Sequence, residues 1–157
     1  MSTIDNNTFF SWVQDELQTG KQVRIPVKGM SMFPFLRDGA DFVTLTSCKP
    51  EELKKRDIVL FVYKNKYIMH RLRYRKETGW IAQGDGNLSK WEFCSDQKIV
   101  GKMTCVYRPD GKVIEANSRK WKWMSSLWTS MGIFKRPLLH VLHARYRHHA
   151  MKQIPKA

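Results

Sequence analysis

Ser31 and His70 are the residues of this chain whose types could carry nucleophilic catalysis together. A serine nucleophile needs a backbone bend that exposes its Oγ and aims neighbouring N–H groups at a developing oxyanion. Gly29 and Pro34 flank Ser31 and are compatible with such a bend, although a surface loop that merely contains serine has the same composition. A histidine with the ordinary pKa of about 6.5 can accept the serine proton near neutral pH.

His70 could also be an ordinary strand histidine, because the alternation of a strand places it on one face with Ile68 and Leu72. The other four histidines lie in the C-terminal part of the chain, at His140, His143, His148 and His149. No acidic residue or cysteine accompanies them there, which favours a solvated or lipid-facing helix over a metal cluster. We therefore expect no metal site and no cofactor. His70 is the only histidine of the central segment.

The elements that must position these residues are mainly strands. From residue 22 to about 116, short runs rich in Val, Ile, Phe and Tyr alternate with turn residues, which predicts an antiparallel β domain. The runs are VRIPV, DFVTL, DIVLFVY, KYIMHRLRY, GWIAQ, IVGKMTCVY and KVIEA. Lys64-Asn65 and Pro109-Asp110-Gly111 separate runs as hairpin turns, so the flanking strands should pair antiparallel. We expect a mainly β fold, a compact antiparallel β domain.

Helical patterns flank this domain on both sides. Before it, a short helix is predicted over Thr8–Leu17 by the four-residue spacing of Phe9, Val13 and Leu17, between Asn7 as N-cap and Gly20 past the end. After Asn117, helical spacing predicts a tail that Pro137 should break into two pieces; its apolar positions are Met124, Leu127, Trp128 and Met131. The chain thus divides into a leading helix (1–20), a β domain (21–117) and a basic amphipathic tail (118–157).

The residues around Ser31 extend into a longer motif, Gly29-Met30-Ser31-Met32-Phe33-Pro34-Phe35-Leu36 followed by Asp38-Gly39-Ala40-Asp41. This string resembles the nucleophile box of type I signal peptidases and LexA-type autopeptidases, Gly-x-Ser-Met-x-Pro-x-Leu followed by an acidic-Gly-Asp stretch. Further segments resemble the later boxes of the same family in the same order. They are Arg56–Val59, Tyr67–Leu72, Gly84–Asn87 and Ile99–Lys102, so that the resemblance covers about Val23 to Met103.

The resemblance implies Ser31 as the nucleophile and His70 as the general base. Most bacterial members carry a lysine at the base position, whereas eukaryotic, archaeal and sporulation-type signal peptidases carry His-Arg, so the match is to the Ser-His branch. In that branch the aspartate of the Gly-Asp-Asn box lies near the dyad, which makes Asp85 the candidate for orienting His70. Asp85 could equally belong to a structural Gly-Asp-Gly turn. The oxyanion would be bound by the backbone N–H groups of Ser31 and Met30.

The activity that the resemblance implies is that of a serine endopeptidase cleaving signal or leader peptides. An extended peptide would add as a strand beside the nucleophile box, with small residues before the cut. The alternative is a non-catalytic module on the same fold that binds membrane or nucleic acid. A LexA-type repressor would need a helix-turn-helix before the core, which about twenty residues cannot supply.

Charge indicates what else the protein binds. Lys and Arg total 28 against 14 Asp and Glu, a formal net charge of +14 that should attract anionic lipid headgroups or nucleic acid. In the tail, tryptophans interleave with cations, which favours an anionic membrane surface as partner, then packing on the core, then nucleic acid; these residues include Trp121, Trp123, Trp128, Arg119, Lys120 and Lys122.

The expected location is the cytoplasm, with the inner face of the membrane as the place of a peripheral anchor. Cys48, Cys94 and Cys105 are odd in number and form no C-x-x-C pair, which argues for a reducing compartment. The N-terminal segment contains Asp5 and Asp15 where a secretory signal would be basic and then apolar. No apolar run approaches the roughly 18 to 20 residues of a membrane-spanning helix.

Overall fold

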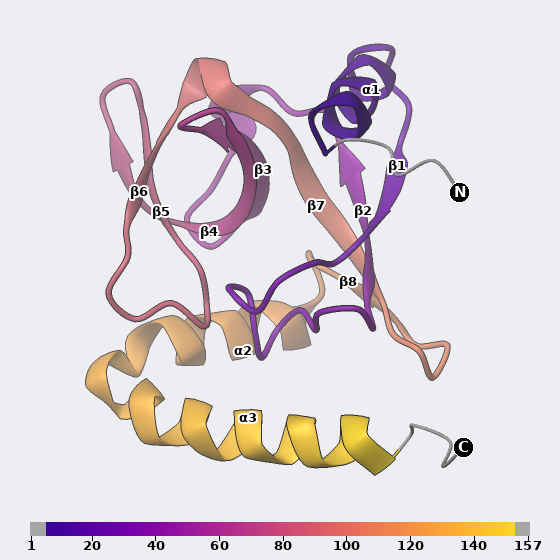
Figure 1. The fold of residues 1–157 in the computed structure, drawn as a ribbon. Helices are drawn as coiled ribbons and strands as arrows, with labels where there is room; N and C mark the ends of the chain where they lie inside the picture. The colour runs from indigo at the N-terminus through magenta and orange to yellow at the C-terminus, as the bar shows by residue number, and fades with distance from the viewer. Residues whose placement is uncertain (1–5, 153–157) are drawn as a thin grey trace.

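The computed structural model describes residues 6–152, with side chains described for residues 7–147. The elements along the chain, drawn in Figure 1, are α1 (Asn6–Gln18), β1 (Val23–Pro26), β2 (Phe42–Thr46), η1 (Pro50–Glu52), β3 (Ile58–Tyr63), β4 (Lys66–Lys76), β5 (Gly79–Gln83), β6 (Glu92–Ser95), η2 (Asp96–Lys98), β7 (Ile99–Tyr107), β8 (Val113–Glu115), α2 (Arg119–Ser130), η3 (Gly132–Phe134) and α3 (Lys135–Lys152). The fold is mainly antiparallel β, with one helix before the sheet and two after it.

One curved sheet forms the body of the molecule, with strand order β1-β2-β7-β3-β4-β5-β6 and β8 paired to β7. Each of the seven apolar runs became a strand, and both expected turns connect antiparallel neighbours. At the β3–β4 turn, Lys64 and Asn65 have φ values of 47° and 59°, the left-handed conformation of a tight hairpin. The strand that the sequence did not predict is β6, which pairs with β5.

Buried side chains gather into two clusters. The larger cluster joins the inner face of α1, through Val13 and Leu17, to β1, β2, β7 and the loop of residues 27–41, and it includes Trp121, Trp128 and Leu139 of the tail. The smaller cluster fills the curl of β3–β6, with Val59, Phe61, Leu72, Trp80 and Cys94 among its members. β4 contributes Leu72 to the smaller cluster and places the buried Arg71 on its opposite face. Both faces of β4 are therefore enclosed.

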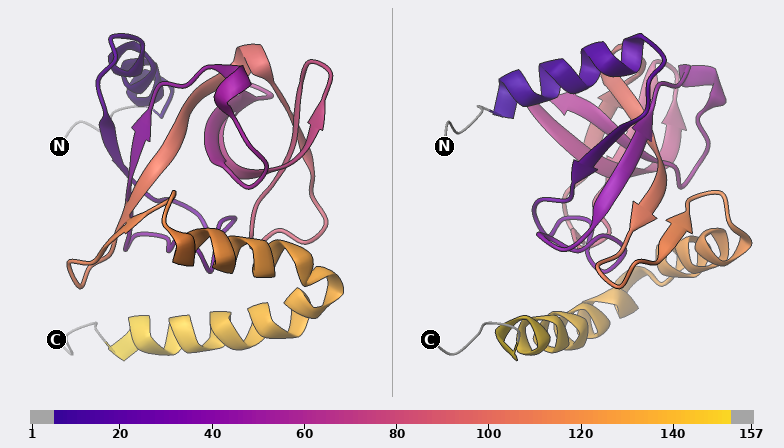
Figure 2. Two further views of the ribbon diagram at one scale, coloured as in Figure 1. Left: turned by 180° about the vertical axis from the view of Figure 1, so that it is seen from behind. Right: turned by 90° about the vertical axis from the view of Figure 1, so that its right-hand side faces the viewer.

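The tail folds back under the sheet, at the end of the molecule away from α1 (Figure 2). Its break lies at Gly132, whose φ is +52°, and not at Pro137 as expected. Pro137 lies in the first turn of α3, where a missing N–H costs no hydrogen bond. The buried face of α2 also differs from the expected one, because Trp128 is buried but Met124 and Leu127 are exposed. Trp121 and Ser125 complete the buried face.

Two further findings concern membranes and metals. Within residues 6–152, none of the helices combines the length and the apolar character that crossing a bilayer requires. Among the described side chains, no three His, Cys, Asp or Glu residues converge in a way that could hold a metal ion. His148 and His149 lie outside the residues whose side chains are described.

Candidate active site

Ser31 lies in the loop of residues 27–41 between β1 and β2, called here the nucleophile loop. Its neck is closed by two backbone hydrogen bonds, from Val27 N–H to the Asp41 carbonyl at 2.9 Å and from Gly39 N–H to the Val27 carbonyl at 3.0 Å. Gly29 has a φ of +84°, and its N–H donates to the Asp38 carboxylate at 2.8 Å. The glycine and the aspartates of the motif therefore shape the loop that carries Ser31.

The Asp41 carboxylate fastens this loop to the sheet. Asp41 is fully buried, and it accepts hydrogen bonds from the Arg37 backbone and guanidinium and from Arg108 at the end of β7. Arg108 also donates to the Phe35 carbonyl at 2.9 Å. Five buried apolar side chains of the loop enter the larger cluster, namely Val27, Met32, Phe33, Phe35 and Leu36. The position of Ser31 is thus fixed from both sides.

His70 lies on β4 and is almost fully buried, at 3% exposure. Its Nδ1 is 2.9 Å from Oε2 of Glu92, the first residue of β6. Burial lowers the pKa of His70, while the charge and hydrogen bond of Glu92 oppose that change. At neutral pH a neutral ring therefore donates its Nδ1–H to Glu92 and leaves the Nε2 lone pair available to accept a proton.

Gly84 brings the serine and the histidine together, immediately after β5. A Cβ added at Gly84 would stand 3.0 Å from His70 Nε2 and closer still to the Ser31 carbonyl oxygen. Both groups therefore contact the same glycine from different elements. Next to it, Gly86 N–H donates to the Ser31 carbonyl at 2.8 Å, which ties the 84–89 loop to the nucleophile. The absence of a side chain at Gly84 is what allows this close approach.

The Ser31 hydroxyl and the expected oxyanion donors are not engaged elsewhere. Within the described part of the chain, Ser31 Oγ makes no hydrogen bond, so no bond joins it to His70 in this structure. The backbone N–H groups of Ser31 and Met30 likewise have no protein acceptor among the described residues. Catalytic hydrogen bonds are often long without substrate and shorten when it binds. The Ser31 backbone thus lies close to His70, and the Ser31 hydroxyl and these two N–H groups remain available.

Two cavities lead along the edge of the sheet to Ser31. The nearer one, of about 220 Å³, is lined by Ser31 and its loop and by Tyr67–Met69 of β4. The second, of about 350 Å³, shares Lys28 and Tyr67 with it and is bordered by Phe9 and Phe10 of α1. Together they form a partly apolar path from α1 to Ser31.

Asp85 does not hold His70, contrary to the expectation. Its carboxylate accepts three hydrogen bonds from the guanidinium of Arg71, from Nε at 2.8 and 3.1 Å and from Nη2 at 2.7 Å. Arg71 is fully buried, and it also donates to Ser125 Oγ of α2 at 2.9 Å. Trp128 Nε1 donates to the Asp85 carbonyl at 3.2 Å. Asp85 therefore neutralises a buried cation that connects β4 to α2.

Glu92 is the site residue that sequence reasoning missed. It lies on the one strand that was not predicted, a four-residue segment that begins with an acidic side chain. Burial alternates along Glu92–Ser95, with Glu92 and Cys94 buried and Phe93 exposed. This alternation was the available signal for a strand. A buried acid opposite a buried histidine could be found only through the pairing of β5 with β6.

No protein-family model matches this chain, and no curated protein matches it. The assignment of a function therefore depends on the motif and on the geometry of Ser31, His70 and Glu92.

Proposed function

We propose that this protein is a serine endopeptidase in which Ser31 is the nucleophile, His70 the general base and Glu92 the residue that orients His70. The observation that carries the proposal is the buried Nδ1–Glu92 hydrogen bond of 2.9 Å, with Nε2 of the same ring directed at the glycine that Ser31 contacts. A serine, a histidine and a carboxylate are the groups of a catalytic triad; here Glu92 is bonded to His70, and the Ser31–His70 hydrogen bond would form when substrate binds.

The chemistry begins with transfer of the Ser31 hydroxyl proton to His70 Nε2 as Oγ bonds to the scissile carbonyl carbon. The oxyanion accepts hydrogen bonds from the Ser31 and Met30 N–H groups, and Glu92 stabilises the imidazolium. His70 then gives the proton to the leaving amine, which breaks the C–N bond and leaves an acyl ester on Ser31. Water, deprotonated by His70, hydrolyses that ester and releases the new carboxyl terminus.

The substrate we propose is an extended peptide, as in a signal or leader sequence, lying along the edge of the sheet. Among the described strands β1 pairs only with β2, so its other edge is available for a further strand. The two cavities follow this edge, with Ile25 and Pro26 in the farther one and Ser31 in the nearer one. The small volume beside Ser31 favours small side chains before the cut.

The test is covalent labelling of the full chain with a fluorophosphonate, which phosphonylates activated serines. Peptide mapping should find the label on Ser31, and Ser31→Ala should abolish it. Ser47→Ala is the matched control, because Ser47 is an exposed serine outside the site. Labelling that persists in Ser31→Ala, or wild-type protein that is not labelled, would contradict the proposal and favour a non-catalytic module that binds membrane or nucleic acid.

We propose the cytoplasmic face of an anionic membrane as the place of action. Large apolar side chains point outward from the tail, with exposures of 66% at Trp123, 78% at Ile133 and 70% at Phe134. They lie amid the cations of the tail, a mixture that suits a membrane interface. Since Trp121 and Trp128 are buried, the tail would bind membrane while remaining packed on the domain.

A further inference from the structure

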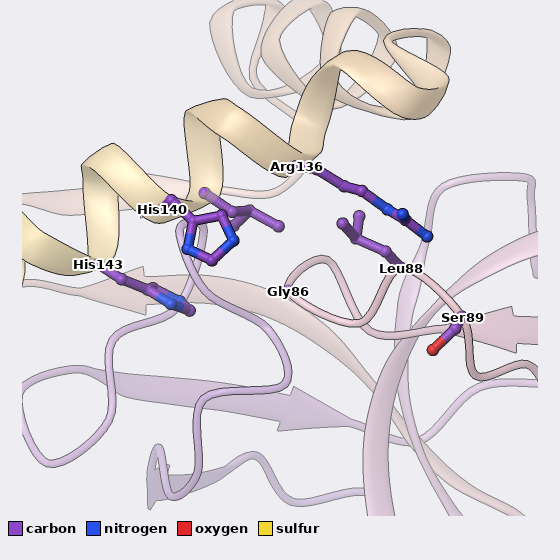
Figure 3. Close-up of a pocket in the computed structure, with 7 residues that line it drawn as sticks. Gly86, Leu88, Ser89, Arg136, His140 and His143 are labelled. Atoms are coloured by element: carbon purple, nitrogen blue, oxygen red, sulfur yellow. The ribbon is translucent and has the colours of Figure 1, made fainter.

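A further cavity, of about 440 Å³, lies between α3 and the 84–89 loop (Figure 3), and Ser31 is not among its lining residues. From α3 it is lined by Arg136, Leu139, His140 and His143, and from the loop by Gly86, Leu88 and Ser89. This space plays no part in the proposed peptide cleavage, and we call it the α3 cavity.

The polar side chains of the α3 cavity come from one face of one helix. Arg136, His140 and His143 stand four and three residues apart, which aligns them along α3. Figure 3 shows the Arg136 guanidinium and both imidazole rings on the side of α3 that faces the loop. No acidic residue lines the cavity. Three nitrogen-bearing groups therefore surround one space without a counter-charge.

These groups also lack hydrogen-bond partners. Among the described residues, Arg136 and His140 form no hydrogen bond or ion pair, and the Nε2 atom of His143 is buried without a partner. Buried polar atoms are seldom left unpaired, because each costs free energy when it is removed from water. The imidazole ring of His143 is held in place by Phe33, and the two ring centroids are 4.6 Å apart. Arg136 and His140 are exposed, so this cost applies to His143 Nε2; an oxygen-rich anion in the cavity would satisfy that atom and bind the other two groups.

We propose that the α3 cavity binds a phosphate-class anion, with Arg136, His140 and His143 as its ligands. A phosphate offers three or more acceptor oxygens in different directions, which suits three separate donors better than the two oxygens of a carboxylate. The volume exceeds that of a phosphate ion, so a phosphate ester also fits. Free phosphate compounds and phospholipid headgroups share this chemistry, and the exposed Ile133 and Phe134 just before α3 make the headgroup a natural source.

The test measures binding of inorganic phosphate to the full chain by calorimetry, at constant ionic strength set with chloride. Arg136→Gln and His140→Gln should each weaken binding, roughly tenfold or more for the arginine because its contact is charged. Both side chains are exposed enough that the variants should fold. Arg145→Gln is the matched control, since Arg145 is an exposed cation on α3 that does not line the cavity.

A second arm separates the sources with vesicles of phosphatidylcholine, with and without phosphatidylglycerol. Binding of inorganic phosphate that Arg136→Gln abolishes and Arg145→Gln preserves supports a site for free phosphate compounds. Binding only to the anionic vesicles, with the same difference between the variants, supports a headgroup site. Equal losses in both variants would reduce the effect to general charge and overturn the proposal, as would a protein that binds neither ligand.

Discussion

Glu92→Gln and Asp85→Asn form a matched pair of substitutions, because each removes the charge of one buried carboxylate and preserves its shape. In Glu92→Gln, the His70 ring loses the negative charge that stabilises its charged form, and the new amide can donate to Nδ1 as well as accept from it, so the tautomer is no longer fixed. We expect turnover or fluorophosphonate labelling to fall by about 10³- to 10⁴-fold. The free energy of unfolding should fall by only about 1 kcal/mol, since the bond lost at neutral pH joins Glu92 to a neutral ring.

Asp85→Asn should give the opposite pattern. Arg71 has no exposed surface, and its guanidinium would lose the carboxylate that neutralises it. Breaking a buried pair in this way costs about 3–5 kcal/mol. For a chain of this size that corresponds to a fall in melting temperature of roughly 6–20 °C. The folded fraction should keep much of its activity, because Asp85 makes no hydrogen bond to His70.

The pH dependence gives an independent readout. The pKa of His70 is already lowered by burial, and Glu92 opposes that change, so removing the Glu92 charge should lower the pKa further. The acid limb of the labelling rate should therefore move to lower pH in Glu92→Gln, and by less in Asp85→Asn, where the charge removed acts on His70 without a hydrogen bond. A fully active Glu92→Gln, together with an inactive Asp85→Asn of unchanged melting temperature, would refute these roles and restore Asp85 as the orienting residue.

Three further predictions concern Gly84 in the 84–89 loop, the tail, and the buried Lys135. Gly84→Ala should abolish labelling because its Cβ would displace the Ser31 carbonyl, and intact labelling in this variant would contradict the prediction. Gly111→Ala, whose Cβ meets no atom within 4 Å, should still be labelled. Ending the chain at residue 117 should yield aggregated protein in expression and melting assays, since losing buried Trp121 and Trp128 costs several kcal/mol; a soluble, cooperatively melting fragment would count against it. Burial lowers the pKa of Lys135 from 10.5 to about 8, so this residue binds more protons in the unfolded chain between these values, and its own contribution to stability should rise with pH there by about 3 kcal/mol. In Lys135→Met that rise should be absent from denaturant melts, and stability at pH 7 should be higher.

The strands were predictable where the chain is dense in β-branched and aromatic residues, as in β3 and β7. β6 was not, because Glu92–Ser95 is short, begins with an acid and gains its stability from pairing with β5. The break in the tail was misplaced for a similar reason. A proline is tolerated in the first turn of a helix, and Gly132 adopts the positive φ that ends the preceding segment.

The motif predicted Ser31 and His70, which the structure brings to the same glycine, but not the contact of His70 with Glu92, because neighbours on a strand face opposite sides. His70 and Arg71 are adjacent, so one points into the curl of β3–β6 and the other toward α2. Asp85 belongs to the motif segment that follows the one containing His70 and Arg71. It lies on the same side of β4 as Arg71. Glu92 reaches His70 from 22 residues away through two strand pairings, which local sequence does not specify.

The Arg71 guanidinium has a consequence for the order of events during synthesis. It is satisfied by Asp85, the Arg56 carbonyl and Ser125, the last of which lies 54 residues further along the chain. At roughly 5–20 residues per second, the ribosome makes that segment in about 3–11 seconds. Until then the Arg71 guanidinium, on the strand that carries His70, lacks one of its hydrogen-bond partners. The packing beneath the strand that carries His70 is therefore completed only after Ser125 has been translated, when the last strand of the sheet, which ends at Glu115, has already been made.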